Sequence, residues 1–185
     1  MQIRISEELN TILLYARDEA MRTGSYAIGA DHLMLGILRH ADNAACLLLK
    51  EMEVDLTAFK RYIDSCLFRD HSVPYSAGDS MSVGRSAQNV INMAAFEALK
   101  VGTAEVQPLH LLLALSRAAE TASAPWLAGR GVDTRSMISQ LEQHGWRYST
   151  TMQPPAEEEV RKTMESQIRS LVLITPSSGG GKVPS

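Results

Sequence analysis

The sequence has few cysteines and no long apolar run. Its two cysteines, Cys46 and Cys66, do not form a Cys-x-x-Cys pattern, so neither a disulfide scaffold nor a zinc framework is expected. Both are predicted to be reduced, packed thiols. No apolar run approaches the ~18 residues that span a membrane, and the polar N-terminus does not resemble a signal peptide. These absences predict a cytoplasmic protein.

The sequence also lacks a strong net charge and is poor in aromatic residues. The formal net charge of the 185 residues is −3, so neither nucleic acid nor a membrane surface is expected as a partner. Aromatic residues make up 5% of the chain and hydrophobic residues 45%. Because methionine, leucine and alanine are plentiful instead, the composition favours interdigitated helices over a β-sandwich. The predicted fold class is therefore all-α.

The chain repeats itself at an offset of 78 residues without a gap. Gly24 corresponds to Gly102 and His32 to His110, since 102 − 24 and 110 − 32 are both 78. Positions that differ in residue type often keep an apolar side chain, so the repeat preserves a packing pattern. Further identical pairs at this offset are Ala16/Ala94, Glu19/Glu97, Leu33/Leu111, Leu35/Leu113, Arg39/Arg117 and Asp55/Asp133.

This offset divides most of the chain into two four-helix units. Repeat 1 is expected over about 3–69 and repeat 2 over about 83–147, with a connecting loop over about 70–82 that contains proline, glycine and several serines. Together the repeats form one predicted domain over 1–147. The expected architecture is an eight-helix bundle with pseudo-twofold symmetry between its halves.

Start and stop signals support this division into helices. Ser6 is a predicted N-cap, and Gly24 is expected to end the first helix. The second helix of each unit is apolar almost all round and is therefore expected to be buried. Asp55 and Asp133 are predicted to cap the fourth helices of the two units.

The C-terminal segment, 148–185, differs in character from the repeats. It is expected to contain a linker, a charged helix over 157–173 and a flexible tail. This helix is interpreted as an appended docking or oligomerisation helix. The tail residues Gly181 and Lys182 do not make a nucleotide-binding P-loop, because the pattern needs a glycine where Pro176 stands.

The residues around the two histidines resemble the N-terminal domain of the Clp (Hsp100) ATPases. The similarity extends over about 3–147; it includes 28–38, and among the second copies it is clearest in 106–115. It implies a pseudo-twofold bundle of eight helices that docks adaptor proteins and receives substrates for an unfoldase and its protease. No room remains for an ATPase module, so a stand-alone protein or an expressed fragment is expected.

The same resemblance implies a candidate ligand site. Some members of the family recognise phosphorylated arginine with the acidic residue before the motif histidine and a hydroxyl near the start of the first helix. Ser6 and Asp31 match these positions in repeat 1, whereas repeat 2 has Gly84 and Leu109 and is not expected to bind this ligand. The hypothesis is therefore a phosphoarginine or basic-peptide site at Ser6 and Asp31. The alternative is that both are helix N-caps, each stabilising its helix by about 1 kcal/mol.

Histidine is a common metal ligand and catalytic base, so His32 and His110 need a separate interpretation. No cluster of cysteine, histidine or aspartate completes a ligand set, and no serine or cysteine occupies a nucleophile motif. We expect neither metal nor cofactor. Both histidines are predicted to be structural, each bonded to a carbonyl of a neighbouring loop.

The sequence thus predicts a non-catalytic protein-binding module of the Clp chaperone and protease system. Its expected partners are a Clp ATPase or protease, an adaptor or an unfolded client. The alternative is a structural accessory protein that attaches to a Clp protease complex, or to a second copy, through its C-terminal helix. An independent enzyme is not expected, because no catalytic constellation is visible.

Overall fold

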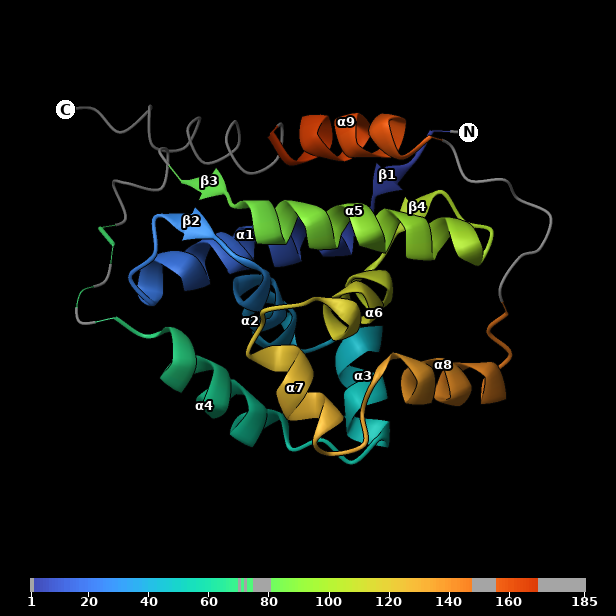
Figure 1. Ribbon diagram of the computed structural model, residues 1–185, viewed down its shortest axis with the longest axis horizontal. Coiled ribbons are helices and arrows are strands. Elements are labelled where there is room, and N and C mark those ends of the chain that lie inside the picture. Colours follow the sequence, from blue (N-terminus) through green and yellow to red (C-terminus); the bar gives the residue numbers. More distant parts are fainter. Residues whose placement is uncertain (1, 70, 72, 75–80, 148–155, 170–185) are drawn as a thin grey trace.

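The computed structural model describes residues 2–69, 71, 73–74, 81–147 and 156–169 (Figure 1). The helices of the first repeat are α1 (Glu7–Arg22), α2 (Ala30–His40), α3 (Ala44–Glu51) and α4 (Leu56–Leu67). Those of the second are α5 (Arg85–Lys100), α6 (Pro108–Arg117), α7 (Ser123–Ala128) and α8 (Thr134–Gln143). A further helix, α9 (Glu157–Ile168), follows. The predicted all-α class is confirmed, and no helix in the described part of the chain has the length and apolarity to cross a membrane.

Four two-residue strands, which the sequence analysis did not predict, join the repeats. They are β1 (Arg4–Ile5), β2 (Ala27–Ile28), β3 (Ser82–Val83) and β4 (Glu105–Val106). β1 pairs in parallel with β4, and β2 with β3. Each pair therefore takes one strand from each repeat, and the two pairs lie toward opposite ends of α5 (Figure 1). Since β3 follows β1 by 78 residues and β4 follows β2 by 78, the pairs are related by the internal repeat.

The second helix of each repeat supplies the centre of the core, as its apolar sequence predicts. Leu33 and Leu35 of α2, and Leu111 and Leu113 of α6, are fully buried. α2 packs most extensively on α1, and α6 on α5. Gly36 permits the first of these contacts, because a Cβ atom at this position would lie 2.6 Å from the backbone oxygen of Ile12.

Several of the predicted helix boundaries are found in the structure. The side chains of Ser6, Asp55 and Asp133 cap α1, α4 and α8. Gly24 has a φ angle of 89° and Gly102 one of 81°, which are left-handed conformations that glycine adopts readily after a helix. These predictions are confirmed.

α9 lies along the bundle, antiparallel to α5 (Figure 1). Its apolar side chains Val160, Met164 and Ile168 are buried, and the helix packs against α5 and β1. The apolar side of this predicted docking or oligomerisation helix therefore packs within the same chain. The remainder of the predicted helix, 170–173, and the tail with Gly181 and Lys182 lie outside the described residues.

The two cysteines lie in different environments. Cys46 is buried in α3, whereas Cys66 is exposed on α4, and neither is in a disulfide. The prediction of a packed thiol is confirmed for Cys46 and wrong for Cys66, because position 66 falls on the solvent side of α4.

Candidate functional site

His32 and His110 close the first turns of α2 and α6. The Nδ1 atom of His32 accepts a hydrogen bond from the backbone N–H of Gly29 at 2.8 Å, and Nδ1 of His110 accepts one from Gln107 at 2.9 Å. The predicted structural role is confirmed, but the partner is an N–H rather than a carbonyl. The reason is position: each histidine is the third residue of its helix, from which a side chain reaches back to the N-cap.

These histidines are neutral in the folded protein. Burial lowers the pKa of His32 from 6.5 to about 4; the charge of Asp31 opposes this shift, and those of Arg22 and Arg69 add to it. Burial alone lowers the pKa of His110 to the same value. Because Nδ1 of His32 accepts a bond, its proton is on Nε2, which lies 3.1 Å from the Thr23 hydroxyl. Both imidazoles therefore act as helix caps and not as proton carriers near neutral pH.

Ser6 and Asp31 lie in different parts of the bundle. Ser6 follows β1, and its backbone N–H donates to the carbonyl of Val106 in repeat 2 at 3.0 Å. Its hydroxyl oxygen accepts a bond from the N–H of Leu9 at 3.1 Å, as predicted for an N-cap. Asp31 instead follows β2, which belongs to the other strand pair (Figure 1). The two candidate ligand residues thus belong to opposite corners of the molecule.

The Asp31 carboxylate caps a helix of the other repeat. Its oxygens accept hydrogen bonds from the N–H groups of Ala122 and Ser123, at 2.8 and 3.0 Å, and from the Ser123 hydroxyl. The N-cap of α2 itself is Gly29, so the alternative prediction that Asp31 caps its own helix is wrong. Asp31 is the second residue of α2, where its side chain points toward the start of α7 instead. In repeat 2 the equivalent residue is Leu109, which has no such group.

A reciprocal contact runs in the opposite direction. The hydroxyl oxygen of Ser86, at the start of α5, accepts a hydrogen bond from the N–H of Ala30 in α2 at 3.2 Å. Repeat 2 therefore caps α2, and α2 in turn caps α7 of repeat 2. Such bonds satisfy backbone groups at helix ends that have no partner inside the helix.

A small cavity lies beside Ser6. It measures about 460 Å³, and its lining includes the carboxylates of Glu7, Glu8 and Glu105. The guanidinium of Arg4 forms an ion pair with Glu105 at 2.7 Å. The excess of carboxylates gives this corner the charge that suits a basic ligand.

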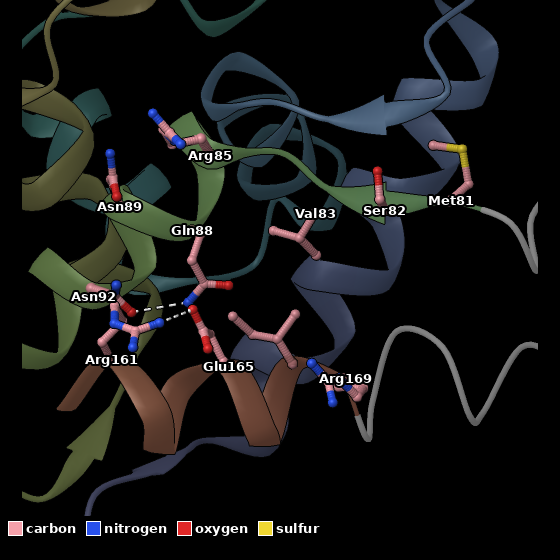
Figure 2. Close-up of a pocket in the computed structure, with 11 residues that line it drawn as sticks. Met81, Ser82, Val83, Arg85, Gln88, Asn89, Asn92, Arg161, Glu165 and Arg169 are labelled. Atoms are coloured by element: carbon pink, nitrogen blue, oxygen red, sulfur yellow. Dashed lines mark hydrogen bonds and ion pairs between the residues drawn. The ribbon is translucent and has the colours of Figure 1, made fainter. Parts of the chain in front are cut away.

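A larger cavity, which the sequence analysis did not identify, lies between β3, α5 and α9 (Figure 2). Its volume is about 630 Å³. The apolar lining comes from Met81, Val83 and Ile168, and the polar lining from Ser82, Arg85, Gln88, Asn89, Asn92, Arg161, Glu165 and Arg169. Arg85 and Arg169 lie on opposite sides of the group of lining residues, whereas Arg161 turns toward Glu165 (Figure 2). The only sequence signal for this cavity is the repeat offset, which makes β3 the counterpart of β1.

Within the described residues, no group of three or more histidine, cysteine, aspartate or glutamate side chains is placed to hold a metal ion. The arrangement instead consists of helix caps, a carboxylate-rich corner and an arginine-rimmed cavity. Such groups bind ligands through hydrogen bonds and ion pairs.

Comparison with known proteins gives a consistent assignment. Residues 4–130 match the Clp repeat (R) N-terminal domain. The chain is 27% identical to the negative regulator of genetic competence ClpC/MecB of Bacillus subtilis over 140 residues. This alignment covers 76% of this chain and 17% of that protein. It is 26% identical over 140 residues to the chaperone protein ClpB of Oceanobacillus iheyensis, with the same coverage of both chains. Identity to the chloroplastic chaperone protein ClpC2 of Oryza sativa is 24% over 143 residues, 75% of this chain and 15% of that one. The chain thus spans less than a fifth of the length of these relatives. α9 lies beyond residues 4–130, which match the family.

Proposed function

Because the chain belongs to the Clp repeat N-terminal domain family, we propose that it is a non-catalytic protein-binding module of the Clp system that binds adaptor or substrate proteins in the cytoplasm. The family match over residues 4–130 carries this proposal. The roles of His32 and His110 support it, since the two repeated histidines are neutral helix caps and not a catalytic pair.

The proposed ligand is a basic or phosphorylated arginine side chain. Ser6 and Asp31 are candidate contacts for two separate side chains of this kind, because they lie at opposite corners of the molecule. The carboxylates of Glu7, Glu8 and Glu105 support a basic ligand near Ser6. Asp31 already accepts three hydrogen bonds from the start of α7. Its participation therefore requires that a ligand replace those bonds.

Calorimetry with phosphoarginine tests this ligand. Ser6→Ala and Asp31→Ala are each expected to weaken binding, whereas Asp55→Ala is a matched control that removes an N-cap in α4. Each loss of a cap costs about 1 kcal/mol of stability, so circular dichroism must show that all three variants are folded. The absence of heat with the unmodified chain contradicts the proposed ligand, and binding by the Asp31→Ala variant equal to that of the unmodified chain contradicts the contact at Asp31.

Affinity capture from native lysate tests the function itself. The full chain is expected to retain a Clp ATPase, a Clp protease subunit or an adaptor, identified by mass spectrometry. Lys162 is exposed on the outer side of α9, and its reversal to glutamate separates the two roles. A module that binds through the repeats keeps its partner in the Lys162→Glu variant, whereas an accessory protein attached through α9 is expected to lose it. Retention of none of these components by the unmodified chain contradicts the proposed function.

A further inference from the structure

β1 and β3 are equivalent strands with different neighbours at their outer edges. Each pairs with one strand of the other repeat, which leaves one edge for another partner. At β1 this partner is the side-chain amide of Gln167 in α9. Its oxygen accepts a bond from the N–H of Ile5 at 2.8 Å, and its nitrogen donates to the carbonyl of Ile3 at 2.6 Å.

The Gln167 amide imitates a residue of a third strand. In a parallel bridge, one residue accepts a bond through its C=O and donates one through its N–H, to groups two positions apart on the neighbouring strand. Gln167 makes this pair of bonds around Arg4 with a single side chain. The outer edge of β1 is therefore complete.

At β3 the equivalent backbone groups are the N–H of Val83 and the carbonyl of Met81. Pairing with β2 uses the N–H groups of Ser82 and Gly84, which donate to Tyr26 and Ile28. Since successive N–H groups of a strand point to opposite edges, the N–H of Val83 points away from β2. No partner for it occurs among the described residues. The 630 Å³ cavity lies along this side of β3 (Figure 2).

The charges at the cavity opening favour an anionic ligand. Arg161 is neutralised by Glu165 at 2.6 Å and by Glu158 at 3.0 Å. Arg85 and Arg169 are exposed, and neither forms an ion pair with any described residue. The apolar lining beside them suits alternate apolar side chains of an extended peptide.

We propose that the outer edge of β3 binds an extended peptide segment of a partner protein. The peptide adds as a parallel strand, as in other cases of strand addition. One residue accepts a bond from the N–H of Val83 and donates one to the carbonyl of Met81 at the cavity floor. Carboxylate or phosphate groups of the peptide pair with Arg85 and Arg169. This inference rests on the proposed protein-binding function and names a docking surface for it.

Nuclear magnetic resonance of the ¹⁵N-labelled full chain tests the inference with three synthetic peptides. The probes are acetylated, amidated Glu-Val-Glu-Val-Glu and its analogues with phosphoserine or lysine in place of glutamate. The glutamate or the phosphoserine peptide is expected to shift the amide resonance of Val83, and comparison of the two identifies the preferred anion. The lysine peptide is expected to leave this resonance unchanged. No shift of Val83 with either anionic peptide overturns the inference.

Variants separate the backbone contact from the charge contact. Val83→Pro removes the N–H and is expected to abolish binding, whereas Val83→Ala retains the N–H and binding. Arg85→Glu combined with Arg169→Glu is expected to weaken binding by about fivefold or more at low salt, with a smaller effect at high salt. Arg135→Glu is a matched control on the exposed surface of α8. If Val83→Pro does not fold, the double arginine variant still tests the inference. Equal peptide binding by the wild type and by this variant overturns it.

Affinity capture distinguishes this inference from the proposed function. Retention of a Clp component by the wild-type chain, with equal retention by the double arginine variant and no peptide-induced shift at Val83, overturns the β3 site alone. Failure of the wild-type chain to retain any Clp component or adaptor contradicts the proposed function instead. Loss of the same component in the double arginine variant, but not in Arg135→Glu, supports both.

Discussion

Repeat 1 and repeat 2 have the same helices and the same histidine caps, but they differ in the side chains around those caps. His32 is bonded to the hydroxyl of Thr23, whereas the equivalent of Thr23 in repeat 2 is Val101 and His110 stacks on Trp146. The backbone role is thus shared between the repeats, while the surrounding contacts are free to differ. The repeat maintains the scaffold, and the asymmetric side chains give each corner its own chemistry.

The outer edges of β1 and β3 likewise share a backbone arrangement but differ in the groups around it. α9 covers one of two equivalent edges, because Gln167 lies at β1 and the cavity lies at β3. A helix that follows the double repeat therefore makes the two halves chemically distinct without altering their fold.

Acidification is expected to cause the largest loss of stability. The pKa values of His32 and His110 are about 4 in the folded protein, compared with about 6.5 in an unfolded chain. The unfolded chain therefore binds more protons between these values, so stability falls as the pH decreases from about 6.5 to 4. The expected loss is about 3 kcal/mol for each histidine, measured by urea unfolding across this range.

Glutamine variants show whether the histidines of both repeats contribute to the pH dependence of stability. Gln at the third position of a helix can still bond the N-cap N–H, but it does not titrate. His32→Gln and His110→Gln are each expected to remove about half of the histidine contribution to the pH dependence. If a variant has the same pH dependence of stability as the wild type, the histidine that it replaces is not held neutral by folding.

The contacts that could be predicted from the sequence are local or repeated. Ser6, Asp55 and Asp133 bond to N–H groups three residues ahead, so their residue type and position before an apolar helix are sufficient. The histidine caps are also local, and the offset of 78 identified both of them. Local hydrogen bonding fixes such positions without knowledge of the tertiary structure.

Contacts between the repeats were not predictable in this way. Asp31 bonds to Ala122 and Ser123, more than 90 residues away, and no periodicity reports that proximity. The strands have two residues each, which is too short for an alternating pattern. The cavity depends on where α9 packs, and its charged sequence indicated a helix but not its position.

The packing of the first two helices can be compared between the repeats at the position of Gly36. Gly36 in α2 has Ala114 as its equivalent in α6. Although alanine favours helices by about 1 kcal/mol over glycine, Gly36→Ala is expected to destabilise the protein by about 1–3 kcal/mol, because its methyl group would meet the backbone of α1.

Ala114→Gly is the matched change in repeat 2. It introduces a flexible residue at a buried position that has room for a methyl group, and an expected loss of about 1 kcal/mol follows. Urea midpoints of the two variants measure both effects. A stabilised Gly36→Ala variant would show that α1 and α2 can separate at no cost, contrary to the close contact.

The smallest expected effect concerns the two strand edges. Gln167→Ala removes two hydrogen bonds from β1, with an expected cost of about 1 kcal/mol. Its more specific consequence is local, because the amide of Ile5 loses its acceptor while that of Val83 keeps its surroundings. Hydrogen exchange is therefore expected to be slower at Ile5 than at Val83 in the wild type and to accelerate at Ile5 in the variant.

Gln167→Glu sharpens this comparison, since its carboxylate still accepts from Ile5 but no longer donates to the carbonyl of Ile3. Protection at Ile5 is expected to persist in this variant while stability decreases, which separates the two bonds of the amide. Equal protection of Val83 and Ile5 in the wild type would show that the edge of β3 is already covered in the free chain. Both edges would then be covered, and they would differ only in the group that covers them.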